Sequence, residues 1–307
     1  EKISSLARGA LLDLLLVNGT VKDIFTIIIK KCYTHDSALG NYFITLTEAL
    51  VQGVEFEYEV YLPLALALFS SGSDNYNVRS SATVLLEYIE MKFYNTSNVS
   101  SYVDGVCCRS RIIYKRTLFQ LSTYFATAHP EEKFRMISEL TMLFNLVGSS
   151  PRRDLVAVLL PWVQTVDLDL NKGSNEIDNY LVVLSNFFDI TMKYSHKIQN
   201  ELEALWVALG TSNIGEGEGV QTIYDYIIAN SLSLKNLAFI ECSRQVIVSI
   251  STIPSKFSLI ESLISNMQPK SMIPFEPEVS KILISEIEKH EFKGLPYVAK
   301  LSKLIQK

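Results

Sequence analysis

The chain has 307 residues, 48% of them hydrophobic and 20% charged, with a formal net charge of −5. This composition is that of a folded, core-forming protein and excludes an intrinsically disordered chain. The acidic balance, with a pI near 5.5, argues against nucleic acid as the main partner. The longest apolar runs fall short of the roughly 18–20 residues that a membrane-spanning helix needs, so membrane insertion is not expected.

The first half of the chain is predicted to be helical because apolar residues recur at three- and four-residue spacing. The predicted helices cover residues 6–17, 21–33, 38–52, 58–69, 77–94 and 109–128. Pro63 should lie in the first turn of its helix or kink it. Phe93 and Ile112 are predicted to face inward. The Ser- and Asn-rich segment 95–104 is predicted to be a mobile loop.

Two helices follow back to back, at about 130–147 and from Ser150 to about residue 168. Pro130 and the two glutamates after it suit a helix start, and Gly148 ends the first helix. Trp162 belongs to the apolar stripe of the second helix, and Pro161 should remove one backbone hydrogen bond and bend that helix near its end. Each stripe is wider than one partner can cover, so the pair needs neighbours on both sides.

The second half continues the same pattern. Further helices are predicted at 178–193, 197–209, 222–230, 236–250, 255–267, 278–290 and 296–306, without sustained strand-like alternation. The pair spacing is close to the ~40–47 residues of HEAT and armadillo repeats. The predicted fold is therefore all-α, a right-handed α-solenoid of HEAT/armadillo-like helix pairs. It forms one continuous array over residues 1–307, with a possible sub-boundary at the Gly- and Glu-rich loop 211–220, and we expect the chain to be a fragment of a longer protein.

Four stretches carry a resemblance to a known family. They are the sequences LLPWVQTVDL at 159–168, PLALALFS at 63–70, NVRSSATVLLE at 77–87 and QPKSMIP at 268–274. In this order they resemble the fungal members of the Furry-like cell morphogenesis proteins. The resemblance implies a helical-repeat scaffold that supports an NDR/LATS-class kinase and its Mob coactivator in polarised growth. It also implies a cytoplasmic protein enriched at the cell cortex or at sites of polarised growth.

Motifs for catalysis are missing from the sequence. Phosphate-binding glycine loops, the GxSxG and HExxH patterns and the kinase signatures do not occur. The four histidines are far apart, and the adjacent Cys107 and Cys108 are expected to be free thiols. We therefore expect no enzymatic activity, no cofactor, no metal and no small-molecule substrate.

Two basic clusters stand out in this acidic chain. Arg109, Arg111, Lys115 and Arg116 form the first, and Arg152 and Arg153 form the second. Both are candidate partner-binding sites, because arginine binds carboxylates and phosphates through two hydrogen bonds at once. The alternative for both clusters is pairing within the repeat array. For Arg79 we expect such a structural role in a ladder between repeats, and Pro161 and Trp162 are likewise expected to be structural.

Two other functions stay open at this level. A peptide-binding adaptor or transport solenoid of the importin or coat kind would present repeated Trp or Asn side chains, and the two tryptophans are 44 positions apart. The chain could also be a purely structural spacer in a large scaffold.

Overall fold

The computed structural model describes residues 2–18, 24–34, 40–54, 58–166, 174–211, 218–234 and 236–253. Within these ranges the protein is all-helical, with twelve α-helices and no β-strand, which confirms the predicted all-α class. The predicted helices after residue 253, the QPKSMIP stretch and most of the loop 211–220 lie outside the described residues.

The first half contains seven of the twelve α-helices. They are α1 (Lys2–Asn18), α2 (Ile24–Thr34), α3 (Asn41–Val51), α4 (Tyr61–Ser70), α5 (Tyr76–Ile89), α6 (Val103–Val106) and α7 (Arg111–Ala128). Pro63 is the third residue of α4 and is buried in its first turn, as predicted. A π-helix (Glu90–Tyr94) extends α5, and a 3-10 helix (Val99–Tyr102) leads into α6.

The second half begins with a 3-10 turn (Pro130–Glu132). It continues with α8 (Lys133–Leu143), α9 (Ser149–Gln164), α10 (Ser174–Thr211), α11 (Glu218–Leu234) and α12 (Leu237–Ile250). The long α10 is interrupted at Ile198, whose φ of −139° and ψ of 45° are not helical. The two helices predicted at 178–193 and 197–209 are therefore the two arms of α10.

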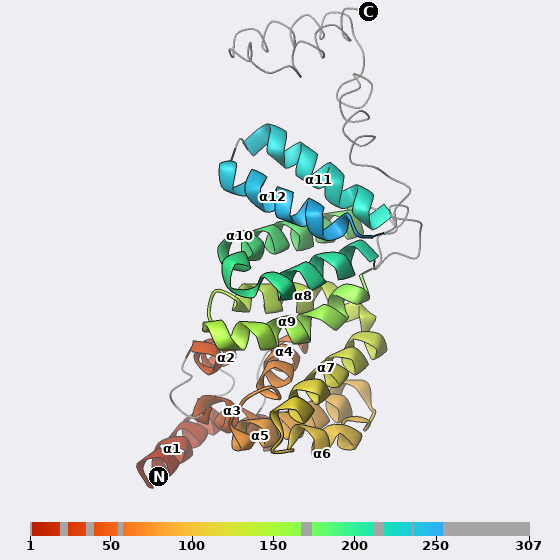
Figure 1. Cartoon of the computed structure of the whole chain (residues 1–307). Helices are drawn as coiled ribbons and strands as arrows, with labels where there is room; N and C mark the ends of the chain where they lie inside the picture. Colours follow the sequence, from red (N-terminus) through yellow and green to blue (C-terminus); the bar gives the residue numbers. More distant parts are fainter. Residues whose placement is uncertain are drawn as a thin grey trace, which may run out of the picture.

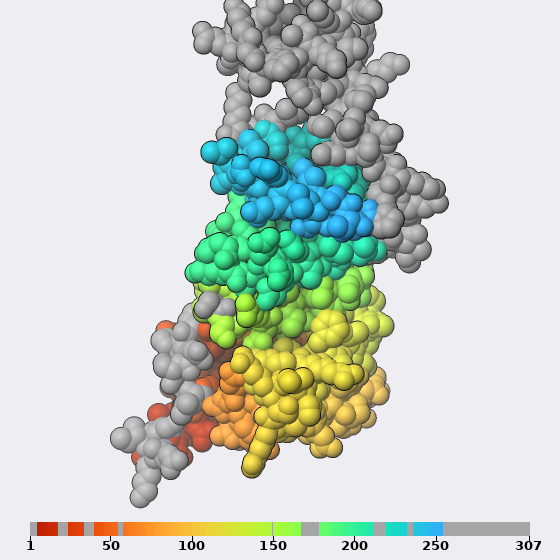
Figure 2. Space-filling model, viewed as in Figure 1, coloured from red at the N-terminus to blue at the C-terminus, as the bar shows by residue number. Residues whose placement is uncertain are grey.

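The helices are stacked in the order of the sequence (Figure 1). Most contacts join helices that are close along the chain: α1 packs on α3, α3 on α5, α7 on α9, and α10 on α8, α9, α11 and α12. Helix α4 also packs on α7, α8 and α9. The space-filling view shows the same succession of layers from one end of the molecule to the other (Figure 2). One apolar core runs through the stack from Leu15 to Ile250 and includes Trp162 and Trp206, which are at most 2% exposed.

Three local predictions were wrong. Phe93 is 41% exposed, because the π-helical turn takes up an extra residue and rotates the side chains that follow Ile89. Ile112 is 82% exposed; it lies on a different face of α7 from the buried Leu118 and Phe125. The segment 95–104, predicted as a mobile loop, contains the 3-10 helix and the start of α6.

Pro161 lies inside α9, which continues three residues further to Gln164. Because Pro161 has no N–H, the Ala157 carbonyl lacks its usual helical donor. One residue further on, the buried hydroxyl of Ser122 on α7 donates a 2.6 Å hydrogen bond to the Val158 carbonyl. This hydrogen bond ties α7 to α9 close to the proline.

Candidate functional site

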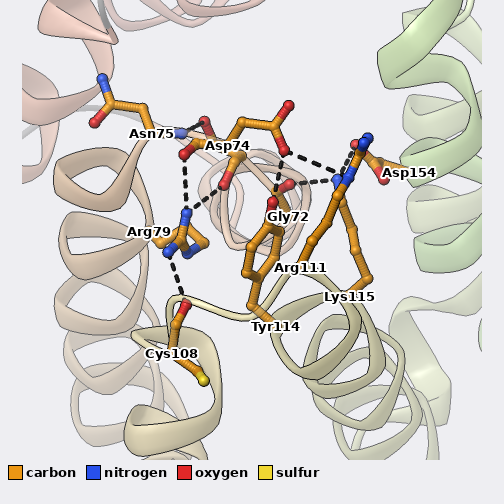
Figure 3. A network of polar contacts seen from close by, with 10 residues as sticks. Gly72, Asp74, Asn75, Arg79, Cys108, Arg111, Tyr114, Lys115 and Asp154 are labelled. Atoms are coloured by element: carbon orange, nitrogen blue, oxygen red, sulfur yellow. Dashed lines mark hydrogen bonds and ion pairs between the residues drawn. The ribbon is translucent and has the colours of Figure 1, made fainter.

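Arg79 is the centre of a polar network that joins α5, α7, α9 and the two loops between them (Figure 3). Its side chain is buried, with 3% exposure. The guanidinium donates to the carbonyls of Val106 at 2.8 Å and Cys108 at 2.9 Å on one side. On the other side it donates to the carbonyls of Ser73 at 2.8 Å and Asp74 at 3.2 Å. We call this network the Arg79 joint.

The aromatic ring of Tyr114 completes the Arg79 joint. The Arg79 guanidinium lies 4.1 Å from the ring centroid, a cation–π contact. The Tyr114 hydroxyl donates a 2.6 Å hydrogen bond to the Asp74 carboxylate, and this bond lowers the pKa of Asp74. The start of α7 is therefore fixed to the loop that precedes α5. A ladder would join side chains at equivalent positions of successive repeats, whereas the hydrogen-bond acceptors of Arg79 are main-chain carbonyls. The role of Arg79 in such a ladder therefore stays a prediction.

Lys115 belongs to the same network and not to a free basic surface. Its ammonium group donates 2.6 Å hydrogen bonds to the Gly72 carbonyl and to the Asp154 carboxylate in the first turns of α9. Both side chains are mostly buried, at 23% and 20% exposure. Burial raises the pKa of Asp154 while Lys115 opposes that rise. Lys115 thus links three segments of the chain.

The second basic cluster is engaged within the protein as well. Arg152 donates to the Phe144 carbonyl just after α8 at 3.0 Å, and its guanidinium lies 4.1 Å from the centroid of the Tyr194 ring on α10. Arg153 forms an ion pair with Glu201 of α10 at 2.9 Å. This carboxylate compensates a cation at the start of α9, where the helix dipole disfavours positive charge. Both arginines connect α9 to its neighbours.

The remaining cations form an exposed surface at the start of α7. Arg109, Arg111 and Arg116 are exposed, and Ile112 between them is 82% exposed. Arg111 lies 3.7 Å from Asp74, but both side chains are about two-thirds exposed, and such a pair contributes little. We call these four residues the arginine surface. It combines exposed guanidinium groups with an apolar side chain, a pattern that suits an acidic segment of another protein.

Sequence reasoning missed a second network, around Glu90. This carboxylate is buried and accepts four hydrogen bonds, from the Tyr124 and Thr96 hydroxyls and the Asn98 and Val99 backbone N–H groups, at 2.6 to 3.0 Å. Burial acts to raise the pKa of Glu90, but these hydrogen bonds outweigh it and the pKa is lowered. The helical spacing around Glu90 does not indicate that this carboxylate is buried and hydrogen-bonded, because all its donors come from other turns and helices.

The described residues offer no site for a metal ion. They contain no group of three or more His, Cys, Asp and Glu side chains placed to hold a metal ion. The four cysteines are free thiols, and burial raises the pKa of Cys242 to about 12, so this thiol stays protonated at neutral pH. None of the helices in this part of the chain could span a membrane.

The structure thus defines a class of protein: a stack of helices joined by buried polar contacts, with a mixed basic and apolar surface on one layer. The chain belongs to the family of the cell morphogenesis central region, whose family model matches residues 2–253. This confirms the resemblance to the Furry-like cell morphogenesis proteins of fungi.

Two curated relatives are similar over most of the chain. The cell morphogenesis protein PAG1 of Saccharomyces cerevisiae is 27% identical over 276 residues, which are 89% of this chain and 11% of that protein. The cell polarity protein mor2 of Schizosaccharomyces pombe is 26% identical over 308 residues, which are 99% of this chain and 14% of that protein. The chain therefore spans about a ninth to a seventh of the length of these relatives.

Proposed function

We propose that this chain is a non-enzymatic scaffold segment in cell morphogenesis and polarised growth. The observation that carries the proposal is the family match over residues 2–253, together with the names of the two relatives, which concern morphogenesis and polarity. The sequence-ordered stack with one continuous core supports a right-handed α-solenoid of HEAT/armadillo-like helix pairs. Such an array presents long surfaces to other proteins.

In this proposal the partners are an NDR/LATS-class kinase and its Mob coactivator, by family resemblance. The scaffold acts by raising their effective concentration near each other and near their substrates. It works in the cytoplasm, at the cell cortex or at sites of polarised growth. The arginine surface holds an acidic or phosphorylated segment of one partner, because its guanidinium groups are exposed and can form charge-assisted hydrogen bonds.

The test is capture of the kinase and the coactivator by the 307-residue chain in a pull-down. Reversing the charge of Arg109, Arg111 and Arg116 to glutamate should reduce capture about tenfold or more, since hydrogen bonds to charged groups contribute about 1.5–3 kcal/mol each. Thermal melting should hardly change, because these side chains are exposed.

A matched triple variant separates local recognition from net charge. Lys31, Lys197 and Arg244 are also exposed and lie on α2, α10 and α12. Reversing these three changes the net charge by the same amount, and capture should persist. Equal loss of capture in both triple variants, or full capture by the Arg109/Arg111/Arg116 variant, would show that the arginine surface is not the binding site.

A further inference from the structure

A second surface lies away from the arginine surface, between α8 and the first arm of α10. A groove of about 430 Å³ runs there, with Tyr61 of α4 also on its wall. Residues from Glu131 to Met142 line it on one side, at positions that share one helix face. Eleven residues of helix extend about 16 Å, which matches about five residues of extended peptide.

The groove exposes apolar side chains on both walls. Met142 on α8 is 59% exposed and Val182 on α10 is 51% exposed, while the neighbouring Val183 is buried. Phe134 adds a half-buried aromatic ring at the same face of α8. Apolar side chains of a partner would therefore be removed from water on both sides of the groove.

Two asparagines on α10 give the groove its polar character. Asn179 and Asn186 both line it and are seven residues apart on one helix face, a rise of about 10 Å. Each side-chain amide offers N–H donors and a carbonyl acceptor. A helical ligand uses its main-chain groups internally, so these amides favour an extended peptide, whose main chain is free to pair with them at points about three residues apart.

Charge selects the kind of peptide. Carboxylates at or beside the groove outnumber the cations there: Glu59, Glu131, Glu132, Glu139 and Asp178 against Lys30, Lys133 and Arg135. The pKa of the Tyr61 hydroxyl is consistent with this excess of negative charge. Burial raises this pKa, and Glu59, Glu139 and Glu132 raise it further, while Arg135 acts to lower it. A basic ligand is therefore favoured and an acidic one repelled.

We propose that the groove between α8 and α10 binds an extended, basic segment of a partner protein, with apolar side chains between its cations. This site goes beyond the proposed scaffold role and does not depend on the arginine surface, which suits the opposite charge. Together the two surfaces would let one chain hold two chemically different segments.

The experiment uses fluorescence anisotropy with the 307-residue chain and a labelled peptide of alternating leucine and arginine, about ten residues long. The same peptide with glutamate in place of arginine serves as the charge control. The basic peptide should bind and the acidic peptide should not. Absence of binding by the basic peptide, or equal binding by both, would overturn the proposal.

Val182→Lys is the decisive variant. It places a cation on the apolar wall, where it removes apolar contact and repels a basic peptide, and should lower the affinity about tenfold or more. Val248→Lys on α12, at a residue that is 63% exposed, is the matched control: it changes the net charge by the same amount and should bind as the unchanged chain does.

Replacing both asparagines, Asn179→Ala with Asn186→Ala, tests the main-chain contacts and should also weaken binding about tenfold. If the Val182→Lys chain binds as tightly as the unchanged one, the groove is not the site. The Arg109/Arg111/Arg116 reversal should leave peptide binding intact. Failure of the groove is thus distinguishable from failure of the arginine surface.

Discussion

Replacement of the buried Arg79 by lysine should destabilise the protein although it preserves the charge. The guanidinium reaches carbonyls on two sides, those of Ser73 and Asp74 on one and those of Val106 and Cys108 on the other. A lysine ammonium is a single point and can serve only one side. Two charge-assisted hydrogen bonds at about 1.5 kcal/mol each are lost, which gives about 3 kcal/mol.

Thermal melting followed by circular dichroism measures this effect. For a domain of about 150–250 residues, about 1 kcal/mol corresponds to roughly 2–4 °C, so on this scale the Tm should fall by about 6–12 °C. Arg79→Met should cost more, about 5 kcal/mol, because it also leaves the buried Val106 carbonyl without its donor. Arg109→Lys, at an exposed position, is the control and should stay within about 0.5 kcal/mol. If the Tm of Arg79→Lys equals that of the Arg109→Lys control, the reasoning is refuted.

Other substitutions test the Glu90 network and the packing at two glycines. Glu90→Gln should cost about 3 kcal/mol at neutral pH, because the amide nitrogen would face a donor such as the Val99 N–H. Since the folded pKa of Glu90 is lowered, its stabilisation is present above the unfolded value of about 4.3 and is lost as the pH falls through the folded pKa. The stability gap between Glu90→Gln and the unchanged chain in urea unfolding should therefore narrow at acid pH, and a constant gap would contradict this role. Gly105→Ala should cost about 2 kcal/mol, because the added Cβ would collide with the Thr117 side chain, whose Cγ2 lies 3.0 Å away. Gly9→Ala, where a Cβ meets nothing within 4 Å, should instead stabilise α1 by about 0.5–1 kcal/mol; equal effects at the two glycines would show that close packing does not decide them.

The helical periodicity in the sequence was reliable where packing follows a regular α-helix. Leu118 and Phe125 are buried as their spacing indicates. The interruption of α10 at Ile198 falls at the second residue of the helix predicted at 197–209, close to the predicted break between two separate helices. The pattern failed at Phe93, where a π-helical turn changes the register, since a count of residues assumes a constant number per turn.

The candidate site shows a different limit. The sequence identified the cations of both basic clusters but could not show which of them are bound within the protein and which are available to a partner. Lys115 is held by Asp154 and Arg153 by Glu201, and these partners are 39 and 48 positions away along the chain. Only the packing of α7, α9 and α10 against each other brings such groups together.

The sequence by itself determined that this chain is helical throughout the described residues and that it belongs to a family of cell morphogenesis proteins. Local spacing and a few ordered motifs are sufficient for that, because helix formation and family signatures depend on residues close in sequence. The tertiary structure decided which cations of the two basic clusters are bound within the protein, how Glu90 and Arg79 fix the loops, and where α8 and α10 form a groove. These features depend on hydrogen bonds and burial between distant segments, which no spacing along one helix contains.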